Sequence, residues 1–337
     1  MRAMRLFTPA PAEDSPLELT HLPLPRPAPG QALLRVLLCG VCRTDLHLVE
    51  GEIHPPSLPV TPGHQVVAEV EALGEGVDCL EIGQRVGAAW LGWACGECAF
   101  CRGGRQNLCP RARFTGFHYD GGFGEYMLGE ANFLLPLPGE ISDLQAAPLL
   151  CAGIIGYRSL RLAELQPVER LGLFGFGASA HLAIQVARHW GCEVYVFTRS
   201  PEHRRHAEQL GAAWTGAAED QPPQPLDRAV IFAPAGWLVP RALEKLRPGG
   251  TLAVNAIHLS PIPEMPYALI YGERTLRSVA NATYQDGLDF IKLAVEIPLR
   301  ASTALYPLED ANEALIDLKH SQLEGEAVLE VGASLSR

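Results

Sequence analysis

From about residue 150 to residue 255 the sequence alternates short apolar runs with amphipathic segments, and this order constrains the fold more than any other feature. We predict strands over 170–174, 194–198, 229–232 and 251–255, with helices over 178–190, 202–210 and 239–246 between them. Strands that alternate with helices in this way form a parallel sheet with helices on both faces. This part of the chain is therefore predicted to be a doubly wound α/β domain.

The preceding 150 residues have a different pattern, because their apolar runs are short and are interrupted by Gly and Pro. We predict a mainly β domain there, with strands over 33–39, 66–73, 125–128 and 133–135. Beyond residue 280 we predict helices over 285–294 and 308–319 and a last strand over 327–331. A length of 337 residues fits about two domains.

Composition excludes several classes of protein. There are 27 basic and 38 acidic residues, a net charge of −11, which argues against a nucleic-acid partner. No apolar run reaches the about 20 residues of a membrane span, and the N-terminus has no signal-peptide core. A hydrophobic content of 47% is typical of a globular chain. We therefore expect a cytoplasmic enzyme without membrane contact.

Nine cysteines in a cytoplasmic chain are better interpreted as thiols than as disulfides. Four of them follow the spacing C-x2-C-x2-C-x7-C, namely Cys95, Cys98, Cys101 and Cys109. Four thiolates close a tetrahedral shell around zinc, which makes such a site structural. An iron–sulfur site is the main alternative, but its last spacing is usually x3. The other alternative is that the four cysteines are unrelated reduced thiols that cluster by chance.

A second set of ligand types is spread along the chain, and its spacing alone is a weak signal. Cys42 lies in C-R-T-D-L-H, His64 lies in G-H-Q, and Cys151 lies in L-C-A-G. Two thiolates and one imidazole would leave zinc a fourth, open position, which is typical of a catalytic site.

A glycine-rich turn lies between the strand predicted at 170–174 and the helix after it. Its pattern is G-x-G-x-x-A, formed by Gly175, Gly177 and Ala180. The first glycine permits the tight turn, the second allows a pyrophosphate to approach the backbone, and Ala180 packs the helix on the sheet. The pattern predicts a Rossmann dinucleotide site.

Together, these segments resemble the zinc-dependent alcohol dehydrogenases of the medium-chain dehydrogenase/reductase superfamily. The resemblance follows the order of the motifs over almost the whole chain. It implies a GroES-like catalytic domain over 1–150 and 281–337, with a Rossmann NAD(P)-binding domain over 151–280. It also implies two Zn²⁺ per chain, the catalytic one held by Cys42, His64 and Cys151.

The same resemblance assigns roles to the neighbours of Cys42. Thr44 would take the alcohol proton and His47 would pass it to solvent, which suits a side chain with an unperturbed pKa near 6.5. Asp45 would fix a ligand imidazole by a hydrogen bond, and Arg43 would contact the pyrophosphate. The alternative for Asp45 is an Asp that only shapes a turn, and the alternative for His47 is an exposed His without a role.

One position departs from the pattern of the family. The residue after the ligand His is usually Glu, close behind the zinc, and here it is Gln65. Gln is uncharged and a weaker metal ligand, so the departure bears on how substrate exchanges at the metal.

The end of the second Rossmann strand predicts the choice of cofactor. An acidic residue there usually binds the ribose hydroxyls of NAD, but this chain has Thr198, followed by Arg199 and Ser200. Arg199 can pair with a 2′-phosphate, and Arg204 can assist. NADP is the predicted cofactor, and NAD is the alternative if Arg199 only stacks on adenine.

The substrate is predicted only as a class. Trp90, and less securely Trp93, fall where related enzymes have an aromatic pocket wall, although both are also typical core residues. The wall suits a primary or secondary alcohol, or an aldehyde, with an apolar tail.

The family implies a homo-oligomer, a dimer or tetramer. A polyol-type dehydrogenase and a non-catalytic zinc- or NADP-binding sensor are the competing functions. Three further cysteines are predicted to be core residues, Cys39, Cys79 and Cys192.

Overall fold

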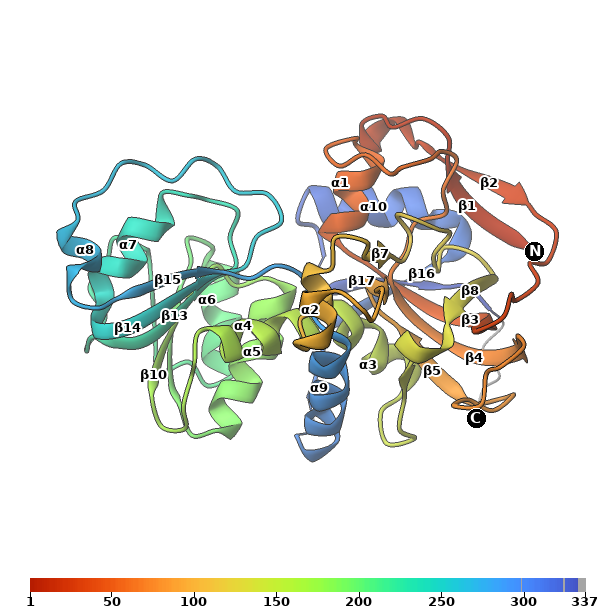
Figure 1. The fold of residues 1–337 in the computed structure, drawn as a ribbon. Coiled ribbons are helices and arrows are strands. Elements are labelled where there is room, and N and C mark those ends of the chain that lie inside the picture. The colour runs from red at the N-terminus through yellow and green to blue at the C-terminus, as the bar shows by residue number, and fades with distance from the viewer. Residues whose placement is uncertain (298, 324, 333–337) are drawn as a thin grey trace. The chain divides into compact units, whose positions relative to one another are not determined.

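A computed structural model describes residues 1–297, 299–323 and 325–332, which form two compact units (Figure 1). Unit 1 comprises Met1–Cys151, Asn281–Val295 and Arg300–Arg337, and unit 2 comprises Ala152–Ala280 and Glu296–Leu299. Among the residues described, no helix is long and apolar enough to cross a membrane.

A seven-stranded sheet forms the centre of unit 1. Its order is β16-β17-β3-β4-β5-β9, with β8 also paired to β3. The strands are β3 (Gln31–Val41), β4 (Gln65–Leu73), β5 (Arg85–Ala88), β8 (Tyr126–Glu130), β9 (Leu135–Pro136), β16 (Thr303–Pro307) and β17 (Glu326–Glu330). Because β17 pairs with β3, the end of the chain completes a sheet begun near its start. The core of unit 1 packs against this sheet and includes Leu34, Val66, Phe123 and Leu329.

Smaller elements surround the sheet of unit 1. Two hairpins are formed by β1 (Arg2–Leu6) with β2 (Leu17–His21), and by β6 (Leu91–Trp93) with β7 (Arg113–Phe114). The helices are α1 (Arg43–Val49), α2 (Ala99–Arg102), α3 (Asp143–Pro148), α9 (Tyr284–Glu296) and α10 (Ala311–Lys319). Short 3₁₀ helices span Ala12–Asp14, Gln106–Leu108, Ala131–Phe133 and Leu308–Asp310, and a π-helical turn spans Leu149–Gly153.

Unit 2 contains a six-stranded sheet in the order β12-β11-β10-β13-β14-β15, in which every pairing is parallel. Its strands are β10 (Arg170–Phe174), β11 (Glu193–Phe197), β12 (Trp214–Gly216), β13 (Leu226–Ile231), β14 (Leu246–Val254) and β15 (Thr275–Ser278). Its helices are α4 (Ile154–Leu162), α5 (Ala178–His189), α6 (Pro201–Gln209), α7 (Leu238–Lys245) and α8 (Ala268–Tyr271). The predicted fold class, a Rossmann sheet plus a mainly β domain, is confirmed.

Local predictions were wrong in several places. The strand predicted over 251–255 begins at Leu246, and the helix predicted over 308–319 begins with the 3₁₀ turn Leu308–Asp310. The run 133–135 is not one strand, because Phe133 closes a 3₁₀ turn in which the Leu134 amide donates to the Ala131 carbonyl. The last strand begins at Glu326, one residue earlier than predicted. Cys79 is exposed, whereas Cys39 and Cys192 are buried as predicted.

Candidate metal and cofactor sites

The start of helix α1 positions the first predicted ligand. Cys42 is the N-cap residue, and its Sγ accepts a hydrogen bond from the Thr44 amide at 3.2 Å. In return, Oδ2 of Asp45 accepts from the Cys42 amide at 2.9 Å. This reciprocal pair is a capping box, which satisfies two backbone donors of the first turn. The C-x-T-D motif therefore builds the helix start and orients the thiol at the same time.

The other two ligands come from segments far apart in sequence. His64 directly precedes β4, and Cys151 lies in the π-helical turn that follows Pro148 at the end of α3. π-Helical turns are rare and are frequent at functional sites. The Cys42, His64 and Cys151 ligand atoms all lie within 4.8 Å of one another, and Cys42 Sγ is 3.2 Å from His64 Nε2. Tetrahedral zinc ligands at bond lengths of about 2.0–2.3 Å lie about 3.5–3.8 Å apart, so the set fits zinc.

Asp45 fixes the orientation of the His64 ring. Its Oδ1 lies 3.1 Å from His64 Nδ1 and accepts from the Gly63 amide at 3.1 Å. With Nδ1 facing a carboxylate, Nε2 faces Cys42, as a metal ligand requires. Burial opposes a charge on His64, but the charges of Asp45 and Cys42 outweigh it and raise the pKa of His64 well above its usual value.

The two thiols of this set, Cys42 and Cys151, interact with each other. The Cys151 thiol donates to Cys42 and holds the pKa of Cys42 well below its usual range, and the nearby His64 charge acts in the same direction. The same contact, together with burial, raises the pKa of Cys151. A negative charge is therefore already stabilised where a cation would be held by thiolates.

The four-cysteine lobe is a separate cluster around α2. Its sulfur atoms lie within 4.8 Å of one another, and Cys95 Sγ is 3.9 Å from Cys101 Sγ. The Cys98 amide donates to Cys95 Sγ and the Cys101 amide donates to Cys98 Sγ, both at 3.4 Å. Desolvation opposes ionisation of Cys95, but the backbone amides of Cys98 and Glu97 lower its pKa to about 6. Four converging thiols without another ligand type fit a closed zinc shell.

The other predicted site residues near Cys42, His64 and Cys151 lie on α1 and just before β6 of the second hairpin. Thr44 is buried beside Cys42, while His47 lies one turn further on, with Nδ1 against the Glu52 carboxylate. Arg43 is exposed at the first position of α1. Trp90 packs its edge against the His64 ring at a centroid distance of 4.9 Å. Trp93, by contrast, lies on β6 opposite Arg113, next to the four-cysteine lobe.

The predicted cofactor turn joins β10 to α5 in unit 2. Gly175 has a φ of +90°, and a Cβ there would lie 2.9 Å from the Ala233 Cβ, so glycine is required. A Cβ on Gly177 would meet open space, which leaves the backbone accessible to a phosphate group, and Ala180 is a buried residue of α5. At the end of β11, Arg204 Nε donates to the Thr198 carbonyl at 2.9 Å. Arg199 is exposed, and Ser200 caps α6.

Comparison with known proteins agrees with this arrangement. Residues 28–139 match the alcohol dehydrogenase GroES-like domain, and residues 180–296 match the zinc-binding dehydrogenase family. A protein named probable alcohol dehydrogenase AdhA from Mycobacterium tuberculosis is 47% identical over 98% of this chain and 97% of its own length. The chain belongs to the zinc-dependent alcohol dehydrogenases. It is an oxidoreductase of that medium-chain family.

Other alcohol dehydrogenases are more distant in sequence but match nearly the whole chain. An alcohol dehydrogenase of Geobacillus stearothermophilus is 31% identical over 94% of this chain and 96% of its own length. The solved structure of a cinnamyl alcohol dehydrogenase from Sorghum bicolor superposes with a TM-score of 0.89 at 26% identity, covering 99% of both chains.

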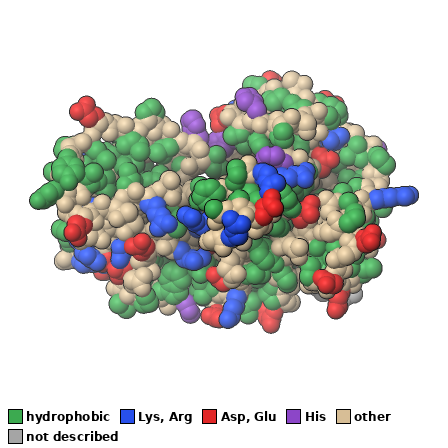
Figure 2. Space-filling model, in the orientation of Figure 1, with side chains coloured by type: hydrophobic (Ala, Val, Ile, Leu, Met, Phe, Trp, Pro, Cys, Tyr) green, Lys and Arg blue, Asp and Glu red, His purple; other side chains and the backbone are tan. Residues whose placement is uncertain are grey.

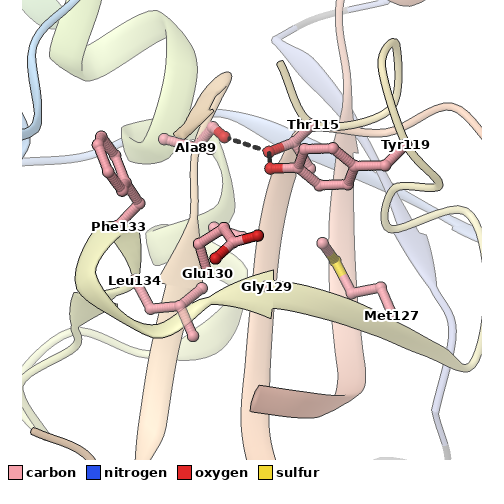
Figure 3. A pocket seen from close by; sticks show the side chains of 10 residues that line it. Ala89, Thr115, Tyr119, Met127, Gly129, Glu130, Phe133 and Leu134 are labelled. Carbon is pink, nitrogen blue, oxygen red and sulfur yellow. Dashed lines mark hydrogen bonds between the residues drawn. The ribbon is translucent and has the colours of Figure 1, made fainter. Parts of the chain in front are cut away.

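A small recess in unit 1 of this alcohol dehydrogenase contains none of the predicted ligands or relay residues (Figure 3). Thr115 lies at its edge, donating to the Ala89 carbonyl at 2.8 Å and contacting the Tyr119 hydroxyl at 3.1 Å. Burial raises the pKa of Tyr119 to about 12, so the phenol stays neutral at physiological pH. Thr115, Tyr119 and the Ala89 carbonyl thus satisfy one another, and the Glu130 carboxylate in the same recess accepts from Gln31 Nε2 at 3.0 Å.

Beside the catalytic set lies a buried residue that the sequence did not single out. Glu326 on β17 is 3% exposed, and its carboxyl group feels the charges of Cys42, His64 and Asp45. Gln65, which follows the ligand His64, is 0% exposed and interacts with the same carboxyl group. The signal for Glu326 would have been an acidic residue directly before the apolar run 327–329, but the predicted strand began one residue too late.

Proposed function

We propose that this alcohol dehydrogenase binds two zinc ions per chain and transfers a hydride between NADP(H) and a primary or secondary alcohol or the matching aldehyde. The observation that carries the proposal is the contrast between two ligand sets. Among the described residues, Cys42, His64 and Cys151 form a set of three ligand types, whereas the four cysteines of the lobe are enough to close a tetrahedral shell. An open position is what substrate chemistry at zinc requires.

The residues around the three ligands would divide the work as follows. Zinc held there supplies a Lewis acid that favours loss of the alcohol proton and polarises an aldehyde carbonyl. Thr44, buried beside Cys42, accepts that proton. His47 receives it next and releases it to solvent, since its side chain is 23% exposed. Asp45 keeps the His64 ring in the ligand tautomer throughout.

The cofactor preference rests on the residues that follow β11. No carboxylate stands at Thr198, Arg199 or Ser200 to repel a 2′-phosphate. Arg199 is exposed and available for that phosphate, while Arg204 is anchored on the Thr198 carbonyl and places a second positive charge nearby. NADP is therefore the proposed cofactor, with its pyrophosphate at Gly175 and Gly177 and with Arg43 as a further contact.

The proposal extends to the substrate and the assembly. Trp90 against His64 supports an apolar, aromatic-lined substrate site, and the cinnamyl alcohol dehydrogenases among the relatives make aromatic aldehydes a suitable test class. Unit 2 exposes several large apolar residues around α7 and α8 (Figure 2), namely Trp237, Ile257, Ile262, Tyr267 and Tyr271. Covering them would favour a dimer or tetramer. Residues 1–150 and 281–337 would be the catalytic domain and 151–280 the cofactor domain.

Metal analysis combined with a turnover assay tests the proposal. We expect two zinc ions per chain and oxidation of NADPH, more efficient than that of NADH, with aldehydes of graded apolar length. Cys42→Ser is expected to lose one zinc and all turnover. Cys79→Ser, which changes an exposed thiol outside both ligand sets, is the matched control and should keep both. One zinc per chain in the wild type without turnover would favour a sensor instead.

A further inference from the structure

The register of the central sheet brings Glu326 to the catalytic ligand set. On β17, Ala327 pairs with Val41 and Val328 pairs with Gly40, so Glu326 falls beside Cys42. On the other side of β3, Gly40 pairs with Gln65 of β4. Directly opposite residues share a face of the sheet, and so do residues two apart on one strand. Glu326 and Gln65 therefore lie on the same face of the sheet.

Gly40 lets these two side chains approach each other across β3. A Cβ added at Gly40 would lie 2.9 Å from Gln65 Nε2 and 3.1 Å from Gln65 Cβ. The Gln65 amide thus occupies the space that a side chain on β3 would otherwise fill. This position points the amide across β3, toward the strand that carries Glu326.

Both side chains are buried without ordinary partners. Gln65 is 0% and Glu326 is 3% exposed. Within the described part of the chain, neither carboxylate oxygen of Glu326 and neither terminal atom of Gln65 makes a hydrogen bond of normal distance and angle. Buried polar groups are nearly always paired, because an unpaired one costs free energy. Such a group next to a metal-ligand set points to a partner that is a cation.

Glu326 lies next to the ligand set by the pairing of the strands themselves. Because it falls beside Cys42 in the register of β17 and β3, its carboxyl group would meet the charge of a cation held by Cys42 and His64.

We propose that Glu326 is a positioning residue that supplies a negative charge beside the ligands of the catalytic zinc, on the same face of the sheet as Gln65. This inference rests on the proposed catalytic zinc site. Glu326 would supply the negative charge that the uncharged Gln65, the residue after the ligand His, does not provide. A buried negative charge beside a divalent cation stabilises the bound cation and slows its release.

Zinc release is the measurement that separates this role from simple packing. Wild type and variants are loaded with zinc, and transfer to a chromogenic chelator is followed over time. The phase missing in Cys42→Ser identifies the catalytic ion. Glu326→Gln should release that ion about tenfold faster or more, in the range typical for residues behind metal ligands. Glu330→Gln removes the same charge from the exposed end of the same strand and should release zinc like wild type.

A swap of the two residues tests whether charge or shape is responsible. The double variant Gln65→Glu, Glu326→Gln moves the carboxylate to the other member of the pair and should restore release to within about threefold of wild type, with thermal melts confirming the fold. Wild-type release from Glu326→Gln, or absence of rescue by the swap, would overturn the inference. A wild type with one zinc per chain would instead overturn the proposed function, so the two failures are distinguishable.

Discussion

Asp45→Asn is the substitution that tests the catalytic site most directly. The Asp45 carboxylate accepts from three N–H donors, belonging to His64, Gly63 and Cys42, at 3.1, 3.1 and 2.9 Å. Asn has the same shape but carries an NH₂ group in place of one oxygen. At least one of the three donors therefore loses its acceptor, and the imidazole loses the negative charge that faces it.

The expected magnitude follows from these contacts. A buried donor left without an acceptor costs about 1–3 kcal/mol, which corresponds to about 5- to 150-fold in an equilibrium constant. If the amide oxygen stays with His64 and Gly63, the NH₂ group faces the Cys42 amide and the capping box is lost. We therefore expect zinc affinity of the catalytic site to fall about 10- to 100-fold. The chain without zinc should lose about 1 kcal/mol of stability, and its Tm should fall by about 1–2 °C.

The assay is a competition titration with a chelator of known zinc affinity, accompanied by thermal melts of the metal-free protein. Glu313→Gln is the control, because it removes an exposed first-turn carboxylate from α10, away from both ligand sets. Wild-type zinc affinity in Asp45→Asn would refute the reasoning, since it would mean that the carboxylate does not orient His64.

Four other substitutions test the relay, the cofactor preference and the Rossmann turn. His47→Ala should lower alcohol oxidation most below pH 7, where direct release of the proton to solvent is slowest; an unchanged pH–rate profile would remove His47 from the relay. Arg199→Asp should raise the KM for NADPH at least about tenfold and leave the KM for NADH less affected; a wild type that uses both cofactors equally would contradict the preference. Gly175→Ala should cost about 1–3 kcal/mol at a φ of +90°, seen as a lower Tm. Gly177→Ala, at a φ of −102° and facing open space, should keep the Tm and weaken only cofactor binding.

The fold could be predicted where local pattern and tertiary packing agree. The parallel strands of unit 2 are continuous apolar runs bounded by helices, so β10 and β11 were located within one residue. In unit 1 the shorter strands were missed, among them β5, β6 and β16, because three to five residues carry too little periodicity to be distinguished from loops. Phe133 shows the limit, since an apolar residue was assigned to a strand and instead closes a 3₁₀ turn that Ala131 begins.

The candidate site separates in the same way into what is local and what depends on register. Thr44 and Asp45 could be assigned to the surroundings of Cys42 from the sequence, because a capping box is formed by four consecutive residues. Nothing local distinguishes Glu326 from Glu330, since both are acidic residues at the ends of one apolar strand. Only the pairing of β17 with β3 buries the first beside a metal-ligand set while the second stays exposed. A residue more than 280 positions from Cys42 can complete its surroundings because a sheet brings together strands that the chain separates, and so single-sequence motifs find ligands more readily than the charges behind them.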